Sequence, residues 1–380
     1  MIFSYKSQFP RARQVVYLDT AAEGLPAPGV RESFEEYCRD KALGTPGRKQ
    51  FHAMEEETRS LAARLLGTDA KNIAFLGSAS EALTALAGSL ELRLGDRVIV
   101  SDIEFPSNIL PWLRLREAGV EVKVVPSQGG TLLFEDVAQN ITSRTRLISL
   151  SLVSYKTGAY LPFVPMLATE AQRVGAVVAI DATQAFGCMP LSLEGIDYLV
   201  SSSFKWLLGP HGVGIVYVSP ELRQRLKPQA VGWYSVVNCF TPDRFDRYEL
   251  KTGAACLSTG MPNFPSLYAL RRSLQFLLEA DIDALHNQTR PVVERIWTGI
   301  AELGFPLLTP AQSDMASNII AFEHADADRL GAALEGEGVI VWAGDGRVRA
   351  SVHLYNNSGD AERYLQALRT VMTLGKGLSD

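Results

Sequence analysis

Residues 201–214 read SSSFKWLLGPHGVG and hold one lysine, Lys205, among small, aromatic and apolar residues. Strand-like runs lie directly before and after this segment, at residues 196–200 and 214–218. A lysine in this setting is poorly hydrated. Because desolvation disfavours the ammonium form, its pKa falls and its amine can attack a carbonyl group. The alternative interpretation is an ordinary surface lysine at the end of a strand.

A second apolar run, AVVAIDATQA at residues 176–185, carries a carboxylate, Asp181, at the end of its strand-like part. Ligands bind outside the carboxyl ends of the strands in open α/β sheets. Pyridoxal 5'-phosphate needs a lysine that carries it as a Schiff base and a carboxylate that keeps its pyridine nitrogen protonated, so that the ring can accept electrons. Lys205 and Asp181 together fit this one cofactor.

The chain resembles the aminotransferase class V family of pyridoxal-phosphate enzymes, which belongs to fold type I and includes cysteine desulfurases and isopenicillin N epimerase-like proteins. The resemblance rests on the order of the aspartate, the glutamine and the Ser-x-x-Lys segment, and it extends from residues 17–22 (YLDTAA) to residues 349–352 (RASV). It implies an α/β fold with a mostly parallel sheet in a large domain, residues 15–275, and a smaller α+β domain, residues 1–14 and 276–380. It also implies a homodimer with shared active sites.

Composition argues against several other classes of protein. The chain has 380 residues and 47% hydrophobic content, enough for one large and one smaller domain, and its formal charge of −5 without a long basic run excludes nucleic acid as an expected partner. Its four scattered cysteines indicate neither a disulfide framework nor a zinc site. Residues 1–7 lack the apolar core of a signal peptide, and no apolar run approaches membrane-spanning length. We therefore expect a cytoplasmic protein with neither a metal site nor a membrane partner.

Hydrophobic periodicity alternates between strand and helix patterns from residue 72 to residue 219, which is typical of a mostly parallel sheet with helices on both faces. Helical spacing precedes this region at residues 30–38 and 52–66, whereas residues 227–265 look irregular. Two helices follow, then a strand, a further helix and two more strands. We therefore expect a second α+β region that begins inside a long helix near residue 275. The strand order is implied by the resemblance alone.

A turn of small residues, Ser78, Ala79 and Ser80, joins the strand-like residues 72–76 to a helical run. The free backbone N–H groups and the dipole of a helix start can hold a phosphate. The alternative is an ordinary N-cap formed by Ser78 or Ser80, and both interpretations use the same geometry. The resemblance adds Ser202 to the residues that would hold the cofactor phosphate.

Further contacts are implied by the resemblance. Phe105, in a proline-marked turn, stands where the family has an aromatic residue that stacks on the pyridine ring, although a plain core phenylalanine is the alternative. Gln184 resembles the partner of the ring phenolate oxygen. Arg349 stands in the family's Arg-x-Ser segment, where the arginine binds the substrate carboxylate through its planar fork; without the resemblance it would be a solvated residue at a strand edge.

The resemblance implies that the substrate is a small amino acid. Lys205 would serve as the general base or acid at the substrate Cα once the substrate has displaced it from the cofactor. Asp181 would keep the ring able to accept electrons. These two are the predicted catalytic residues.

Departures from the family pattern bear on the chemistry. Tyr155 replaces a common asparagine, Phe204 replaces a histidine before the lysine, and Met261 replaces a threonine that reaches the phosphate of the partner subunit. Residues 341–348 form a short loop without a cysteine, whereas cysteine desulfurases carry a nucleophilic cysteine there to take the sulfur.

Three hypotheses follow. The first is an aminotransferase, epimerase or C–S/β-lyase, which needs only Lys205, Asp181 and Arg349. The second is a cysteine desulfurase-like enzyme that releases sulfur without the usual loop cysteine. The third is a non-catalytic protein that binds the cofactor. The sequence does not name the substrate.

Overall fold

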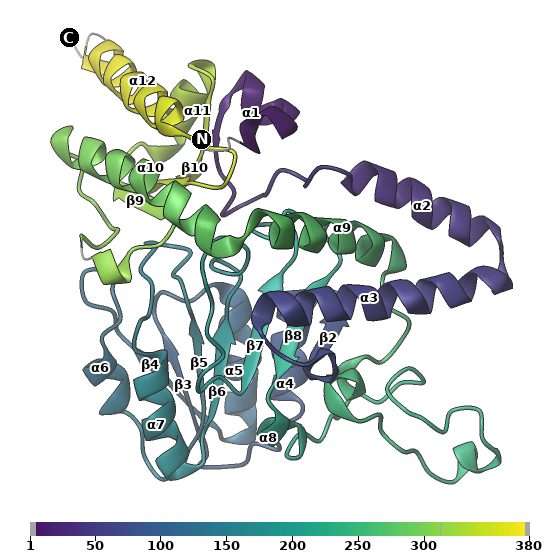
Figure 1. Ribbon diagram of the computed structural model, residues 1–380. Coiled ribbons are helices and arrows are strands. Elements are labelled where there is room, and N and C mark those ends of the chain that lie inside the picture. Colours follow the sequence, from purple (N-terminus) through teal and green to yellow (C-terminus); the bar gives the residue numbers. More distant parts are fainter. Residues whose placement is uncertain (1–4, 312, 377–380) are drawn as a thin grey trace.

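The computed structural model describes residues 5–311 and 313–376, and it contains two β-sheets (Figure 1). The larger sheet has seven strands in the order β2-β8-β7-β6-β5-β3-β4. Its strands are β2 Ile73–Leu76, β3 Arg97–Ser101, β4 Glu121–Val125, β5 Thr145–Ser151, β6 Val177–Asp181, β7 Tyr198–Ser202 and β8 Gly214–Val218. Neighbouring strands are parallel except in the two pairs that include β8. The predicted mostly parallel α/β sheet is confirmed.

Successive side chains of a strand point to opposite sides of the sheet. Both faces of the larger sheet are covered by other elements, so both sets of side chains are buried. On β6, Val178 and Ile180 join one hydrophobic cluster, whereas Val177 and Ala179 join another. The first cluster includes side chains from α3, α7 and α9, and the second includes side chains from α4, α5 and α8. The helices are α3 Arg48–Leu66, α4 Ala79–Ala87, α5 Leu110–Arg114, α6 Phe134–Ala138, α7 Val164–Val174, α8 Pro220–Arg223 and α9 Phe264–Ala280.

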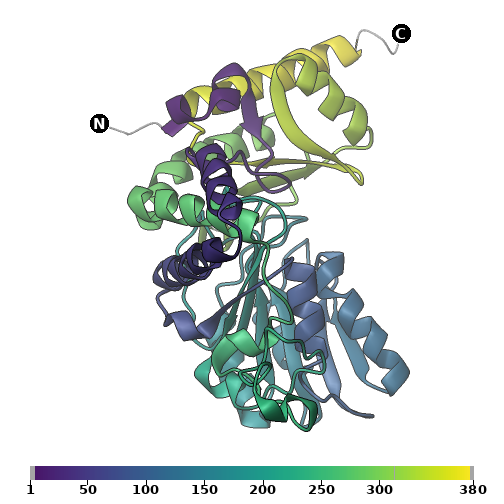
Figure 2. The same ribbon diagram turned by 90° about the vertical axis from the view of Figure 1, so that its right-hand side faces the viewer.

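The smaller sheet has four strands in the order β1-β10-β11-β9 and lies above the larger one in Figure 2. Its strands are β1 Val16–Leu18, β9 Ile319–Glu323, β10 Val339–Gly344 and β11 Arg347–Ser351. The pair β1 and β10 is parallel, and the other two pairs are antiparallel. The core of this part contains side chains from α10 Ile282–Glu302, α11 Ala327–Gly336 and α12 Ser358–Lys376.

The remaining elements are short helices and turns. Helices α1 Pro10–Gln14 and α2 Val30–Ala42 flank the N-terminal segment that contains β1. Short 3-10 turns occur at Tyr5–Gln8, Thr45–Gly47, Ala70–Asn72, Pro106–Asn108, Leu115–Ala118, Pro242–Phe245, Gly253–Leu257 and Ser313–Met315. Residues 227–265 are otherwise irregular, as predicted. In the described part of the chain, no helix combines the length and apolar character that crossing a bilayer needs.

The predicted domain division at residue 275 stays a prediction. Residues 1–4 of the predicted small domain lie outside the described residues. Two features bear on the boundary: β1 pairs with β10 in the smaller sheet, and the helical run breaks at Asp281, whose φ is 62°, between α9 and α10. Asp281, six residues beyond the predicted boundary, caps α10 through its own side chain.

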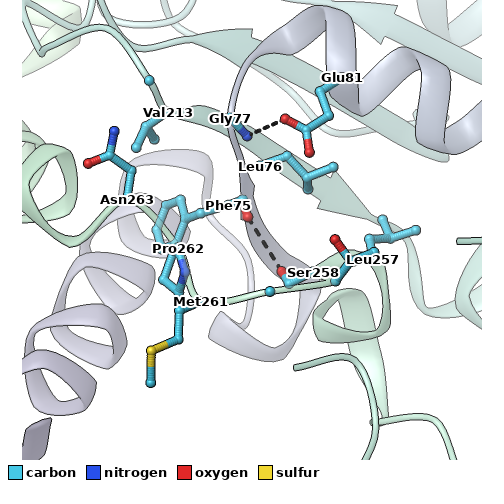
Figure 3. Close-up of a pocket in the computed structure, with 13 residues that line it drawn as sticks. Phe75, Leu76, Gly77, Glu81, Val213, Leu257, Ser258, Met261, Pro262 and Asn263 are labelled. Carbon is cyan, nitrogen blue, oxygen red and sulfur yellow. Dashed lines mark hydrogen bonds between the residues drawn. The ribbon is translucent and has the colours of Figure 1, made fainter. Parts of the chain in front are cut away.

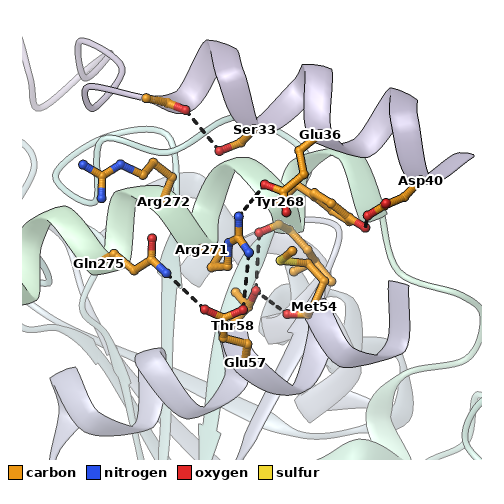
Figure 4. A network of polar contacts seen from close by, with 12 residues as sticks. Ser33, Glu36, Asp40, Met54, Glu57, Thr58, Tyr268, Arg271, Arg272 and Gln275 are labelled. Carbon is orange, nitrogen blue, oxygen red and sulfur yellow. Dashed lines mark hydrogen bonds and ion pairs between the residues drawn. The ribbon is translucent and has the colours of Figure 1, made fainter. Parts of the chain in front are cut away.

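Polar contacts fix helix α9 against α2 and α3 (Figure 4). Arg271 of α9 pairs with Glu36 of α2 at 2.6 Å and with Glu57 of α3 at 3.3 Å, and only 16% of its side chain is exposed. Tyr268 donates a hydrogen bond to Asp40 of α2 at 2.5 Å. These contacts hold α2 and α3 against α9.

The segment between β1 and α2 crosses the loop that contains Lys205. Gly24 donates its N–H to the carbonyl of Phe204 at 2.9 Å, and Ala27 donates to the carbonyl of Leu208 at 3.0 Å. A Cβ atom on Gly24 would lie 2.0 Å from the carbonyl oxygen of Lys205, so only glycine permits this approach. The N-terminal segment therefore forms one wall of the region around Lys205.

Candidate active site

A pocket at the carboxyl ends of β5, β6 and β7 brings together the eight residues predicted to contact the cofactor. These residues come from four separate stretches of the chain and meet because parallel strands end at the same edge of the sheet. The lining contains Ser78, Ala79, Ser80, Phe105, Asp181, Gln184, Ser202 and Lys205. Arg349 lies close by but does not line the pocket.

Lys205 follows β7 and is largely buried. Burial lowers the pKa of its amine to about 8, Asp181 opposes this shift, and the positive charge of Arg349 adds to it. Its Nζ atom lies 5.5 Å from the ring centre of Phe105 and 5.6 Å from that of Phe204. The amine therefore has aromatic neighbours and a lowered pKa, which is the condition that the sequence predicts for a nucleophilic lysine.

Asp181 is the last residue of β6 and is 6% exposed. Burial raises the pKa of its carboxyl group, while hydrogen bonding with Thr183 and the charge of Lys205 oppose this shift. The backbone N–H of Thr183 donates to Oδ1 at 2.9 Å. A cationic ring nitrogen in the pocket would stabilise this carboxylate, because an opposite charge nearby favours the ionised form.

The turn before α4 contains a helix N-cap and further serine hydroxyl groups. Ser78 accepts a hydrogen bond from the N–H of Glu81 at 3.1 Å and is the N-cap of the helix. The hydroxyl groups of Ser80 and Ser107 lie 2.6 Å apart, and the N–H of Ser202 donates to the hydroxyl of Thr183 at 3.1 Å. A helix start with several hydroxyl groups is a suitable environment for a phosphate.

Gln184 is held by two hydrogen bonds. Its Oε1 accepts from Nε1 of Trp206 at 2.7 Å, and its Nε2 donates to the carbonyl of Ala21 at 3.0 Å. A side-chain amide has two N–H donors, so the second can reach a ligand oxygen in the pocket. The orientation of this side chain is thus fixed before any ligand binds.

Arg349 reaches the site from β11 of the smaller sheet and is 3% exposed. Its Nη1 donates to the carbonyl of Tyr155 at 2.8 Å, and its Nη2 lies 3.8 Å from Oδ1 of Asp19. Burial lowers the pKa of Arg349 to about 10 and raises the pKa of Asp19 to about 6. The arginine is therefore not the solvated strand-edge residue of the alternative interpretation.

Glu104 is a buried residue of the site region that the sequence analysis did not single out. Its carboxylate accepts hydrogen bonds from Ser101, from Asn108 and from both the N–H and the hydroxyl of Ser151, at 2.5 to 2.9 Å. Burial raises its pKa, and these donors oppose the shift. Glu104 thereby fixes the turn that carries Phe105 to the end of β5. The available signal was its position directly before Phe105.

Thr183, Ser107 and Tyr155 also line the pocket and were not among the predicted contacts. Thr183 stands between Asp181 and Gln184 in the sequence, which would have been sufficient to suggest it. The ring of Tyr155 meets that of Phe105 edge to face, with their centres 5.1 Å apart.

Of the other departures from the family pattern, Phe204 lines the pocket around Lys205, whereas Met261 does not. Phe204 stacks on His211 with ring centres 4.1 Å apart, and His211 contacts Glu23 near the surface. Met261 lies in a second pocket, next to Pro262 and across from Gly77 (Figure 3). All four cysteines lie within the described residues, and none lines the pocket around Lys205.

The pocket offers what pyridoxal 5'-phosphate requires: an amine with a lowered pKa, a buried carboxylate, an oriented amide and a helix start with hydroxyl groups. Fold and site together define a pyridoxal-phosphate-dependent enzyme of fold type I. Within that class, the chain belongs to the aminotransferase class-V family, whose model matches residues 16–364.

Individual relatives agree with this assignment. A probable cysteine desulfurase of Methanothermobacter thermautotrophicus is 28% identical, and the alignment covers 97% of this chain and 98% of the relative. The uncharacterized aminotransferase YcbU of Bacillus subtilis is 27% identical over 93% of each chain. The apo structure of a cysteine desulfurase from Thermococcus onnurineus NA1 has a TM-score of 0.88 and 23% identity, with 96% of both chains covered. This last similarity shows the fold alone.

The lowered pKa of Lys205 predicts how its reactivity depends on pH. A group with a pKa of about 8 is half neutral at pH 8 and about one tenth neutral at pH 7. We expect trace acetylation of the apoprotein by acetic anhydride, followed by peptide mapping, to give a labelling rate for Lys205 that is half-maximal near pH 8 and level above pH 9.

The control is the same peptide in the urea-unfolded chain, where the labelling rate should still rise at pH 10 because an unfolded lysine has a pKa near 10.4. Identical pH profiles in the native and unfolded chains would show that the pocket does not perturb the amine.

Proposed function

We propose that the enzyme acts on a small α-amino acid by moving a proton at the substrate Cα, in an aminotransferase, epimerase or C–S/β-lyase reaction. The observation that supports this most directly is the common pocket of Lys205 and Asp181, in which burial lowers the pKa of the amine and raises that of the carboxyl group. A general base whose pKa lies near the working pH combines a large neutral fraction with sufficient basicity.

Each residue has a separate task in this proposal. When bound, the cofactor supplies a ring that accepts electrons from Cα. Lys205 binds it covalently and then takes or returns the Cα proton, and Asp181 holds the proton on the ring nitrogen. Gln184 donates to the ring oxygen, Phe105 stacks on the ring, and Arg349 binds the α-carboxylate through its fork. The phosphate is held by Ser78, Ala79, Ser80 and Ser202.

The second candidate is a cysteine desulfurase-like reaction, because curated relatives that match nearly the whole chain are named for that activity. The loop that would carry the nucleophilic cysteine is the tight connection between β10 and β11, where Asp345 and Gly346 form the turn. Cys188 is buried and burial raises its pKa well above the usual value, which opposes thiolate formation. These observations favour the first candidate.

A cysteine-replacement assay tests whether a thiolate of this chain takes the sulfur. If a thiolate of this chain took the sulfur, replacing the four cysteines Cys38, Cys188, Cys239 and Cys256 by alanine would abolish sulfur release from L-cysteine in the presence of dithiothreitol. We expect the wild-type protein and the four-fold variant to release sulfide at rates within about threefold of each other, because elimination at Cβ needs only proton transfer at Cα. Loss of sulfide release in the variant, with cofactor absorbance retained, would favour the desulfurase.

Asp181→Asn tests the role of the carboxylate. Losing the partner of a buried charge costs several kcal/mol, and each 1.36 kcal/mol at the transition state is about tenfold in rate. We expect at least about a thousandfold slower exchange of the substrate α-hydrogen with deuterium, measured with an amino acid that shifts the cofactor spectrum, while borohydride reduction still places the cofactor on Lys205.

Asp102→Asn is the matched control for this experiment. Asp102 follows β3 as Asp181 ends β6, but it is exposed and accepts a hydrogen bond from the N–H of Ser127 at 2.9 Å. The control should exchange at the wild-type rate. Near-normal exchange in Asp181→Asn would remove the carboxylate from the mechanism.

We also propose that the protein is a homodimer with shared active sites in the cytoplasm. Large apolar side chains are exposed in the irregular segment before α9, which extends away from the sheet in Figure 1, among them Trp233, Val237, Phe240, Phe245 and Tyr248. Such a concentration of exposed apolar side chains is typical of an interface. Four free cysteines suit a reducing compartment.

Sedimentation should therefore give twice the chain mass of 41.5 kDa. Placing aspartate at both Phe240 and Phe245 should shift the equilibrium toward monomer and lower activity with it. Leu94→Asp is the control, because Leu94 is as strongly exposed as the two phenylalanines, at 84%, but lies outside the segment. A fully active monomeric wild-type protein would contradict the proposal.

A further inference from the structure

Arg347 and Arg349 lie on the same face of β11. Along this strand Val348 and Ala350 enter the core of the smaller part, so the alternate residues point the other way. On that opposite face, Ser351 accepts from the N–H of Ala21, and Arg349 donates to the carbonyl of Tyr155. The face that carries both arginines is therefore turned toward the active site.

Arg347 is buried without adequate partners. It is 3% exposed, and two of its nitrogens, Nε and Nη2, are shielded from solvent with no hydrogen-bond acceptor among the described residues. Its Nη1 reaches only Oδ2 of Asp345 at 3.4 Å, and that side chain is 76% exposed. A buried donor without an acceptor costs about 1–3 kcal/mol, more when charged, so this guanidinium lacks an anion that would use its fork.

Aromatic rings hold Arg347 in place beside the pocket. Its guanidinium carbon lies 4.4 Å from the ring centre of Trp342 and 5.5 Å from that of Tyr155. Arg349 shares the Trp342 ring at 5.3 Å. The ring of Tyr155 also contacts Phe105, which lines the pocket around Lys205, so a single side chain separates Arg347 from that pocket.

The carboxylates near this pair are only loosely engaged: Asp345 lies 3.4 Å from Arg347 and is 76% exposed. Arg349 has Asp19 at 3.8 Å, and its own Nε also lacks a hydrogen-bond acceptor. The positive charge of Arg347 is one of the causes that lower the pKa of Arg349. A substrate α-carboxylate on Arg349 still leaves Nε and Nη2 of Arg347 without an acceptor.

We infer that the substrate has a second anionic group at the end of its side chain, a carboxylate or a sulfinate, and that Arg347 binds it while Arg349 binds the α-carboxylate. This inference rests on the proposed function. Residues two apart on a strand are separated by roughly 6.7 Å, which suits the two acidic groups of an aspartate- or glutamate-sized molecule. Access to Arg347 requires rotation of the partly exposed Tyr155 ring, an ordinary side-chain motion.

The test compares two amino acids that lack an α-hydrogen and therefore do not lose a proton there: α-methyl-L-aspartate and 2-aminoisobutyrate. Their binding to the holoenzyme is measured from the shift of cofactor absorbance. We expect α-methyl-L-aspartate to bind at least tenfold more tightly. Repeating the titration with α-methyl-L-glutamate and with α-methyl-L-cysteine sulfinate identifies the preferred length and the preferred anion.

In Arg347→Gln the preference should fall to within about twofold, with the affinity for 2-aminoisobutyrate unchanged. Arg349→Gln should weaken both ligands. Asp345→Asn is the matched control: it removes the carboxylate that competes for Arg347, so the preference should be kept or increased. If Arg347→Gln does not fold, the wild-type ratio and Arg347→Lys, which keeps the charge but loses the fork, decide the question.

Equal affinities of the wild-type enzyme for the two ligands, or equal weakening of both by Arg347→Gln, would overturn this inference. The proposed function would remain in that case, since 2-aminoisobutyrate would still shift the cofactor spectrum. Failure of every amino acid to shift the spectrum of a cofactor bound at Lys205 would instead refute the proposed function.

Discussion

The charge on Lys205 is the central constraint on this structure, because Asp181 in the same pocket and Arg349 beside that pocket both act on the amine. Each of them alone would be costly to bury, because desolvation opposes the ionised form. The carboxylate of Asp181 offsets part of the cost at Lys205, because it raises the pKa of the amine, whereas the like charge of Arg349 adds to that cost. The state of the amine therefore depends on both neighbours, and a change at Asp181 or Arg349 alters the pKa of Lys205.

The scaffold maintains this arrangement through residues that surround the pocket. Glu104 collects donors from three different segments and so ties the end of β5 to the turn after β3. Gly24 lets the N-terminal segment approach the carbonyl of Lys205 more closely than any other residue would permit. The geometry of the site thus depends on residues that do not touch a ligand.

Sequence patterns were sufficient for the parts of the site that lie at strand ends. Asp181 and Lys205 each follow an apolar run, and the carboxyl ends of parallel strands meet at one edge, so their proximity could be predicted. The role of Glu104 could not, because a glutamate in a turn is usually solvated and Ser151, which donates two of its hydrogen bonds, is 47 residues away in the sequence. Strand β1 has three residues and no periodicity of its own, and helix α12 was not anticipated. The burial of Arg349 depends on how the two sheets are placed, which no local pattern specifies.

The pairing of β1 with β10 has a consequence for biosynthesis. Val16 lies opposite Val339, so β1 has to wait for a strand that is translated more than 300 residues later. Contacts this distant in sequence form late, since closing the intervening loop is entropically unfavourable. The larger sheet can be complete while Asp19 and Ala21 still lack their partners on β11, Arg349 and Ser351. The side of the active site that β11 supplies is therefore missing from a nascent chain until β10 and β11 have been translated.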